Sequence, residues 1–269
     1  MSDSDFERRF GGLRRLYGVE GAQRIFDAHV AVVGIGGVGS WAVEALARSG
    51  VSRLTLIDLD HVAESNINRQ IHAQDSSLGQ AKALAMRERI AAFHPGCVVD
   101  VIEDFVTADN WPALLGELPV PDALIDACDQ VRAKTALAGW SMSRRVPLVS
   151  VGAAGGKRLA HAVDLADLAD TTHDPLLAQL RYRLRREHGA ARDGRIGVAC
   201  VFSKEAVAPP DASCQIEGGD GSLNCHGYGS VVSVTATFGL CAAGWVLNGL
   251  AGGPNRHPAF KKAKKDAII

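Results

Sequence analysis

A cluster of glycines near residue 34 has the spacing of a phosphate-binding loop. The glycines are Gly34, Gly36, Gly37 and Gly39, in the pattern G-x-G-x-x-G with one glycine more. They stand between the apolar run 29–33 and a helical pattern, where glycines allow a tight turn and let a phosphate approach the N–H groups at the helix start. Asp58 ends the next apolar run, where a carboxylate can accept ribose hydroxyls. The pattern predicts a nucleotide site, and a glycine turn without a ligand is the less favoured alternative.

Charged residues further along the chain indicate which nucleotide this site would hold. Alone, the glycine loop and Asp58 suggest NAD, but Arg69 and Lys82 add two cations that hydride transfer does not need. A triphosphate does need them, because its charge must be neutralised. Asp129 ends the fourth apolar run, and a carboxylate there suits Mg²⁺ held partly by phosphate oxygens. The plainer alternatives are solvated surface charges for Arg69 and Lys82 and a helix N-cap for Asp129.

Alternating strands and helices would bring these residues together. Apolar runs predict buried parallel strands at 29–33, 53–60, 98–103, 122–129 and 147–152. Helical patterns follow the glycine loop and cover 78–93, 108–118 and 130–145, with Thr107 as the N-cap of the second of these three. The fold class is therefore α/β, a Rossmann-like, doubly wound and mostly parallel sheet. Ligands bind at the carboxyl edge of such sheets, where the glycine loop, Asp58 and Asp129 all fall.

The regular alternation of predicted strands and helices ends after residue 156. Two further strands are predicted at 158–165 and 197–203, with a helix at 175–188 between them. A polar, glycine-rich stretch at 208–226 leads to an apolar helix at 231–250. That helix is long enough to span a bilayer, but its serines, threonines and glycines favour a helix buried in the domain. Membrane association through 231–250 is thus the less favoured interpretation.

Composition and charge limit the function classes. The 269 residues carry a net charge of −1, with 47% apolar and 22% charged residues, which excludes a disordered chain and a uniformly basic nucleic-acid coat. A local basic cluster is present all the same, and we expect it to contact RNA phosphates, with a solvated helix face as the alternative. It consists of Arg181, Arg183, Arg185, Arg186, Arg192 and Arg195. Tyr182 could stack a base there, and four lysines at 261–265 extend the basic surface.

The cysteines argue against a zinc site. The chain has six cysteines and no C-x-x-C pair, so we expect no structural zinc. Widely spaced thiols and a polar N-terminus indicate a reduced, cytoplasmic location. Cys200, Cys214 and Cys225 remain candidates for handling sulfur, although ordinary buried or loop cysteines are the favoured interpretation.

The motifs of the first half resemble the adenylating domain of the ubiquitin-activating-enzyme superfamily. The resemblance rests on GxGGxG, on D-x-D-x-V-x-x-S-N-x-x-R-Q from Asp58 to Gln70, on G-x-x-K ending at Lys82 and on D-x-x-D ending at Asp129. It implies ATP and Mg²⁺ as cofactors, with the ribose on Asp58, the metal ion on Asp129 and the phosphates on the glycine cradle. Further nucleotide contacts are implied for Asp60, Asn66, Arg69, Gln70 and Lys82.

The same resemblance implies a second subunit. Arg9 resembles an arginine that this superfamily inserts into the ATP site of the partner subunit, so a homodimer is expected, and Arg8 or Arg15 could serve instead. Arg9, Arg69, Lys82 and Asp129 then form the catalytic set. The expected organisation is an N-terminal helical arm over 1–28, an ATP-binding adenylation core over 29–156 and a C-terminal extension over 157–269, together forming one compact unit.

The second half points to one branch of the superfamily. VSVGAAGG, DPLLAQLRYRLRR and GVACVFSKEA, with RRFGGLRRLYG at the start, resemble the tRNA threonylcarbamoyladenosine dehydratases. This implies tRNA as a partner and ATP-dependent cyclisation of its N6-threonylcarbamoyladenosine to an oxazolone, through adenylation of the threonyl carboxylate. The alternative is adenylation of the C-terminus of a small ubiquitin-like sulfur carrier, which the missing C-x-x-C pairs disfavour. A cysteine-desulfurase or sulfur-acceptor system is left open as a further partner.

Overall fold

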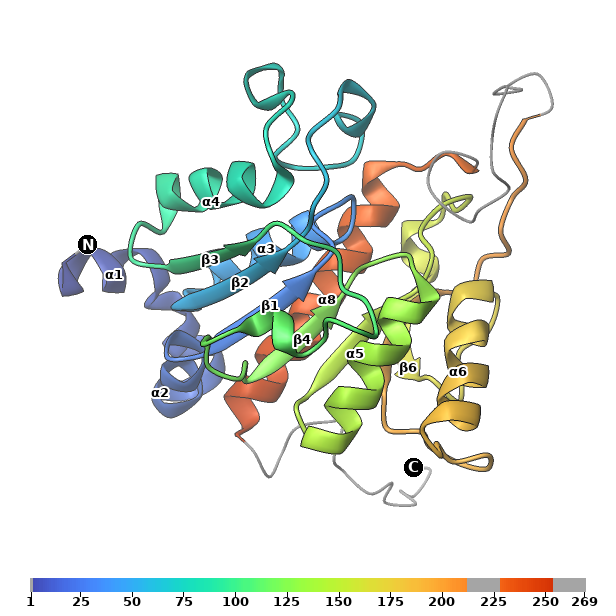
Figure 1. The fold of residues 1–269 in the computed structure, drawn as a ribbon. Helices are drawn as coiled ribbons and strands as arrows, with labels where there is room; N and C mark the ends of the chain where they lie inside the picture. Colours follow the sequence, from blue (N-terminus) through green and yellow to red (C-terminus); the bar gives the residue numbers. More distant parts are fainter. Residues whose placement is uncertain (1, 212–227, 254–269) are drawn as a thin grey trace.

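One seven-stranded sheet organises the computed structural model, which describes residues 2–211 and 228–253 (Figure 1). The strands are β1 (His29–Val33), β2 (Arg53–Ile57), β3 (Val98–Ile102), β4 (Ala123–Asp126), β5 (Leu148–Val151), β6 (Val163–Asp167) and β7 (Ala199–Ser203). Their order is β3-β2-β1-β4-β5-β7-β6, and every pair is parallel except β6 with β7. The predicted α/β class with a mostly parallel sheet is confirmed.

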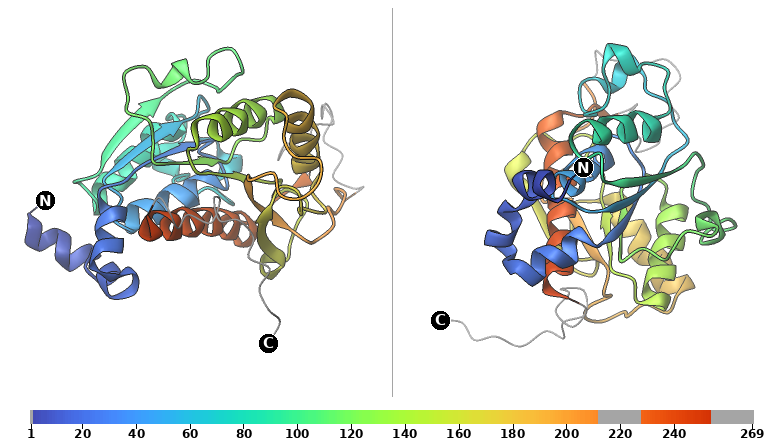
Figure 2. Two further views of the ribbon diagram at one scale, coloured as in Figure 1. Left: turned by 90° about the horizontal axis from the view of Figure 1, so that it is seen from below. Right: turned by 90° about the vertical axis from the view of Figure 1, so that its left-hand side faces the viewer.

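Helices cover both faces of the sheet (Figure 2). They are α1 (Asp3–Phe10), α2 (Gly12–Phe26), α3 (Gly39–Arg48), α4 (Lys82–Phe93), α5 (Val131–Arg144), α6 (Pro175–Glu187) and α8 (Val232–Gly252). One apolar core packs α2, α3, α4 and α8 against the sheet, and a second packs α5 and α6 against the other face. This two-sided burial explains why β1 and β4 are apolar without alternation.

The strand order reverses between β1 and β4. Val33, the last residue of β1, pairs with Ile57 of β2 on one side and with Asp126 of β4 on the other. The three strands therefore end level with one another, and the loops that follow them leave from the same edge. Such a switch point is where open α/β sheets bind ligands.

The C-terminal extension continues this sheet. β7 pairs parallel with β5, and β6 closes the edge antiparallel to β7. α8 packs against α3, α2 and β5, and a Cβ on Gly239 would lie 2.4 Å from the carbonyl oxygen of Val38, so this glycine allows the close approach. α8 is apolar and long enough to cross a membrane, yet 56% of its most apolar stretch is buried in the protein. Packing in the core therefore accounts for its composition.

Three predicted elements differ from the structure. The predicted helix at 108–118 is wrong: turns and a short 3₁₀ segment, Ala113–Leu115, stand there, because Pro112 lacks an N–H and Gly116 has a φ of +56°. The predicted helix at 78–93 begins only at Lys82, after a glycine with a φ of +80° at position 79. The predicted strand at 158–165 is replaced by a 3₁₀ turn over 160–162 and by β6.

Candidate nucleotide-binding site

The glycine loop turns from β1 into α3 at the carboxyl edge of the sheet. Gly34 has a φ of +84°, and a Cβ there would lie 2.8 Å from the carbonyl oxygen of Ala127. A Cβ on Gly39 would lie only 1.7 Å from the carbonyl oxygen of Gly34, so both positions need glycine for the turn itself. Around Gly36 the nearest atom to such a Cβ is 3.9 Å away, at the Gln70 amide. The loop thus leaves open space above Gly36, at the helix start where a phosphate can bind.

Asp58 holds this loop against the end of β2. One carboxylate oxygen accepts a hydrogen bond from the N–H of Ile35 at 2.5 Å, and the other accepts one from the N–H of Asp60 at 2.8 Å. Burial raises the pKa of this carboxyl, and the nearby charge of Lys82 lowers it only in part. The side chain predicted to bind the ribose therefore also fixes the shape of the phosphate loop.

Lys82 stands at the start of α4 and faces Asp60. Its ammonium group lies 2.7 Å from the Asp60 carboxylate, and its backbone N–H donates to the Asp60 carbonyl oxygen at 2.9 Å. Lys82 is buried, whereas the side chain of Asp60 is half exposed. The alternative of a solvated surface lysine is therefore wrong. The lysine is held in place by a carboxylate that an incoming phosphate could replace as its partner.

The segment 64–70 brings three further predicted residues to the same edge. The Asn66 side chain caps its own turn by accepting the N–H of Ala63 at 3.1 Å. Arg69 donates to the carbonyl oxygen of Ser65 at 2.7 Å, and a Cβ on Gly37 would lie 3.3 Å from its side chain. Gln70 is buried, and its amide oxygen has no partner among the described residues. Arg69 and Gln70 thus border the glycine loop, and their contact with phosphates stays a prediction.

Asp129 lies in the loop between β4 and α5, and its side chain is exposed. It does not cap the helix, because the N-cap position of α5 is Gln130, without a side-chain capping bond. Because β4 is a parallel neighbour of β1, the loop that carries Asp129 starts at the same edge of the sheet as the glycine loop. The Asp129 carboxylate is placed where a metal ion on a bound triphosphate could use it.

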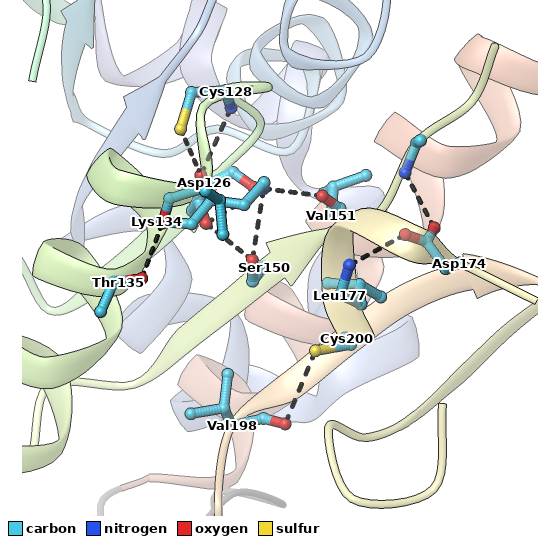
Figure 3. A network of polar contacts seen from close by, with 12 residues as sticks. Asp126, Cys128, Lys134, Thr135, Ser150, Val151, Asp174, Leu177, Val198 and Cys200 are labelled. Carbon is cyan, nitrogen blue, oxygen red and sulfur yellow. Dashed lines mark hydrogen bonds and ion pairs between the residues drawn. The ribbon is translucent and has the colours of Figure 1, made fainter. Parts of the chain in front are cut away.

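A buried polar network beneath this loop escaped the sequence-based prediction (Figure 3). Lys134 of α5 donates to the carboxylate of Asp126 at 3.1 Å and to the carbonyl oxygen of Val151 at 2.7 Å. Ser150 donates to the same carboxylate at 2.6 Å, and the thiol of Cys128 donates to its other oxygen at 2.9 Å. The signal was present, since Asp126 is the first acid of the D-x-x-D motif and Lys134 interrupts an apolar helix face.

Another unpredicted residue is His72, just beyond the segment 64–70. It is buried, and neither ring nitrogen has a hydrogen-bond partner among the described residues. Burial, together with the charges of Lys82 and Arg89, lowers the pKa of His72 to about 4. The ring is therefore neutral near pH 7 and adds no charge to the site.

Arg9 lies at the opposite edge of the sheet within its own chain. Its guanidinium donates to the carbonyl oxygen of Phe93, at the end of α4, at 2.6 Å. The neighbouring Phe10 packs near Gly50, just before β2, so α1 lies beside the amino ends of β2 and β3 (Figure 1). Arg9 does not reach the glycine loop of its own chain, and a role in a partner's site stays a prediction.

The basic cluster of α6 and the loop after it divides into two groups. Arg181 donates to the carbonyl oxygens of Leu168 and Thr171 at 2.9 and 3.0 Å, and Arg185 donates to two carbonyl oxygens of the following loop. These two guanidiniums hold their own segment together. Of the other four, Arg183 is half-buried beside Glu187, whereas Arg186 beside Glu187, Arg195 beside Asp167 and Arg192 are exposed. Their contact with RNA stays a prediction.

The thiols in the described part of the chain are buried or partly buried. Burial raises the pKa of Cys128 and of Cys200 well above that of a free thiol, so neither is a ready nucleophile. Cys214, Cys225 and the lysines at 261–265 lie outside the described residues. Within residues 2–211 and 228–253, no group of three or more His, Cys, Asp or Glu side chains could hold a metal ion.

Comparisons with known proteins agree with this geometry. The chain is 45% identical over 256 residues to the tRNA threonylcarbamoyladenosine dehydratase of Escherichia coli K12, covering 92% of this chain and 94% of that one. The crystal structure of the E. coli enzyme in complex with ATP superposes with a TM-score of 0.82 over 93% of this chain and 96% of that one, at 45% identity. The molybdopterin-synthase adenylyltransferase of E. coli is 33% identical over 136 residues, 51% of this chain and 53% of its own.

A family model settles the classification. The model of the ThiF family matches residues 11–266, which includes the glycine loop, the segment 64–70, Lys82, Asp129 and the extension that follows. The chain therefore belongs to the ThiF family.

Proposed function

We propose that this protein cyclises N6-threonylcarbamoyladenosine in tRNA, with loss of water, at the expense of ATP. The observation that carries the proposal is the extent of similarity. The match to the E. coli dehydratase runs through both the nucleotide loop and the C-terminal extension, whereas the match to the sulfur-carrier adenylyltransferase covers half of the chain. Arg69 beside the glycine loop and Lys82 at the same edge of the sheet supply the cations that an adenylation needs.

In the first step, a threonyl carboxylate oxygen attacks the α-phosphorus of ATP. Pyrophosphate leaves, and the carboxylate becomes an acyl-adenylate. Negative charge builds up on the phosphate oxygens, so the chain's contribution is positioning and neutralisation. Backbone N–H groups of the glycine loop, the guanidinium of Arg69 and the ammonium of Lys82 supply it. Asp60 keeps Lys82 in place until the nucleotide binds.

An exposed Asp129 fits Mg²⁺, which takes one or two carboxylates together with phosphate oxygens and water. Because the described residues contain no cluster of three protein ligands, the substrate phosphates would provide the other ligands. Bound there, Mg²⁺ would neutralise charge on the leaving pyrophosphate.

In the second step, the carbonyl oxygen of the neighbouring ureido group attacks the activated carboxyl carbon. AMP leaves with one oxygen of the original carboxylate, a ureido N–H gives up its proton, and a five-membered oxazolone ring closes. The nucleophile belongs to the same molecule, so its effective concentration is already high. No enzyme thioester is required, in keeping with the raised pKa values of Cys128 and Cys200.

The proposal extends to partners and location. Two copies would form a homodimer in which Arg9 of each chain reaches the other's nucleotide, and the exposed arginines of α6 and of the loop after it would contact tRNA. A cytoplasmic enzyme agrees with the burial of α8 in the core. A cysteine-desulfurase or sulfur-acceptor system is not required by either chemical step.

One incubation tests the proposal. Purified protein is mixed with ATP, Mg²⁺ and either tRNA carrying N6-threonylcarbamoyladenosine or a ubiquitin-like sulfur carrier. We expect pyrophosphate release only with the modified tRNA, and mass spectrometry of the digested tRNA should find the modified nucleoside lighter by one water. Pyrophosphate release with the sulfur carrier alone would contradict the proposal and support the alternative.

A further inference from the structure

A cleft of about 470 Å³ lies on the face of the sheet that α5 and α6 cover. Its walls come from α5, from the end of α6 and from residues 108–112, and no residue of the glycine loop lines it. The aromatic and charged side chains of its lining are two tryptophans, two arginines, a glutamate and a histidine: Trp111, Trp140, Arg132, Arg183, Glu187 and His188. Its size falls within the range of about 300–1,000 Å³ that small-molecule sites occupy. The proposed reaction steps leave this cleft unused.

The two tryptophans form one wall. Their ring centroids lie 5.2 Å apart and their planes meet at 81°, an edge-to-face arrangement that fixes both rings. Trp111 is only 7% exposed, and its indole N–H has no hydrogen-bond partner among the described residues. An indole N–H can only donate, so this wall lacks an acceptor.

A glycine allows close packing where α5 and the end of α6 meet. A Cβ built on Gly139 of α5 would lie 2.2 Å from the ring of His188, at the end of α6. The glycine thus lets the imidazole close directly against α5. The cleft is therefore a shaped feature of the α5–α6 contact and not a gap between loops.

Cations outnumber anions in the cleft, since two arginines line it against the single carboxylate of Glu187. Arg132 lies in the first turn of α5, three residues after Asp129, and is exposed; within the described part of the chain no ion pair is formed by it. Arg183 shares the carboxylate of Glu187 with Arg186. The lining thus includes an arginine from the helix start that follows the Asp129 loop and an arginine from the basic cluster.

We propose that this cleft binds an unpaired base of the tRNA substrate, a neighbour of the modified adenosine. The inference rests on the proposed function. RNA is read mainly through unstacked bases held against aromatic rings and guanidinium planes. A nucleotide brings the acceptors that the cleft lacks, since a base oxygen or ring nitrogen can accept from Trp111 and a phosphate can accept from Arg132. An aromatic side chain of a protein partner would bring none of these acceptors.

Two tryptophan variants test the site by the affinity of the full-length protein for labelled tRNA. Trp140→Ala removes an aromatic face and should weaken tRNA binding about tenfold, the effect typical of a lost base stack. Trp111→Phe keeps a ring but removes the N–H, and should weaken binding less. Trp245→Phe, in α8 on the other face of the sheet, is the matched control and should bind tRNA as the wild type does.

Folding and ATP affinity are measured for each variant, so that a collapsed protein is not mistaken for a lost contact. If Trp140→Ala and Trp111→Phe keep their fold and ATP affinity and also bind tRNA with wild-type affinity, the cleft is not a base site. If Trp140→Ala fails to fold, Trp111→Phe and Arg132→Gln decide instead: weaker tRNA binding by both supports the site, and unchanged binding overturns it. Turnover of modified tRNA by the wild type is assayed in parallel, and its absence would refute the proposed function separately.

Discussion

The ammonium of Lys134 lies 3.1 Å from the carboxylate of Asp126, and neither side chain has any exposed surface. The pair sits where β4 and β5 end, and Lys134 also donates to the carbonyl oxygen of Val151 (Figure 3). It therefore ties together the two loops that leave this part of the carboxyl edge. One of these loops carries Asp129, so a buried ion pair supports the exposed carboxylate that we assign to Mg²⁺.

Replacing only one partner of this pair should be costly. Lys134→Met leaves the Asp126 carboxylate buried without its cation, and we expect a loss of about 3–5 kcal/mol in the free energy of unfolding. The double variant Asp126→Asn, Lys134→Met removes both charges and should lose much less than the sum of the single changes. Urea unfolding of the three variants measures the difference, and strictly additive losses would contradict a direct interaction.

Two glycines of the loop should fail in different ways. Gly39→Ala places a methyl group 1.7 Å from the carbonyl oxygen of Gly34, so the turn must rearrange and the protein should lose stability. Gly36→Ala meets no atom within 3.9 Å and should keep the fold, but its methyl group enters the space left for a phosphate. We expect Gly36→Ala to keep the melting temperature and to weaken ATP binding in calorimetry. Unchanged ATP affinity in a folded Gly36→Ala protein would place the phosphate elsewhere.

The sequence predicted the layout of the site better than its internal contacts. Runs without alternation identified the strands, and the strand order then brought the glycine loop, Asp58 and Asp129 to one edge. What it could not predict is how each polar side chain divides its hydrogen bonds. Both carboxylate oxygens of Asp58 accept hydrogen bonds from backbone N–H groups, because the loop folds back over the end of β2. The spacing of residues in the sequence does not predict these hydrogen bonds.

Tertiary structure also decides which arginine side chains are used in internal hydrogen bonds and which are exposed. The arginines of the basic cluster look equivalent in the sequence, yet Arg181 is bound to the loop at 168–171 and Arg192 is exposed. The composition of residues 108–118 is compatible with a helix, but Pro112 and Gly116 prevent a continuous helix there. Sequence patterns are most reliable where many residues share one periodicity, and least reliable where a single residue sets the backbone.

Stability should fall in mild acid through His72. Its folded-state pKa is about 4, against about 6.5 in an unfolded chain, so the unfolded state takes up the proton first as the pH falls. Between these values the free energy of unfolding decreases with falling pH, by about 3 kcal/mol in total for a shift of this size. Urea unfolding at pH 7.5 and pH 5 measures the change. His72→Gln should reduce this dependence, and the exposed His161→Gln should not; equal slopes for His72→Gln and the wild type would refute the assignment.

The arginines of the basic cluster at 181–195 should separate into RNA contacts and structural groups. Arg192→Ala removes an exposed cation, and we expect weaker tRNA binding and a salt dependence shallower by about 0.7–0.9 in the log–log slope for each lost phosphate contact. Arg181→Ala breaks bonds to Leu168 and Thr171, so its main effect should be a lower melting temperature. A salt dependence identical to wild type in Arg192→Ala would exclude that residue from the RNA surface.

Mixed dimers test whether Arg9 acts on the partner's nucleotide. Arg9 lies at the amino edge of its own sheet and Lys82 at the carboxyl edge, so one chain alone cannot bring them together. Arg9→Ala and Lys82→Ala should each be inactive in modified tRNA turnover. When the two proteins are unfolded and refolded together, half of the dimers combine one of each, and in these one of the two sites has both residues. Activity should then return to about a quarter of the wild-type level, as random pairing in a twofold dimer requires.

Lys82→Ala mixed with the double variant Arg9→Ala, Lys82→Ala has no intact site and should stay inactive. Recovery with Arg8→Ala or Arg15→Ala in place of Arg9→Ala, and not with Arg9→Ala, would move the role to one of those arginines.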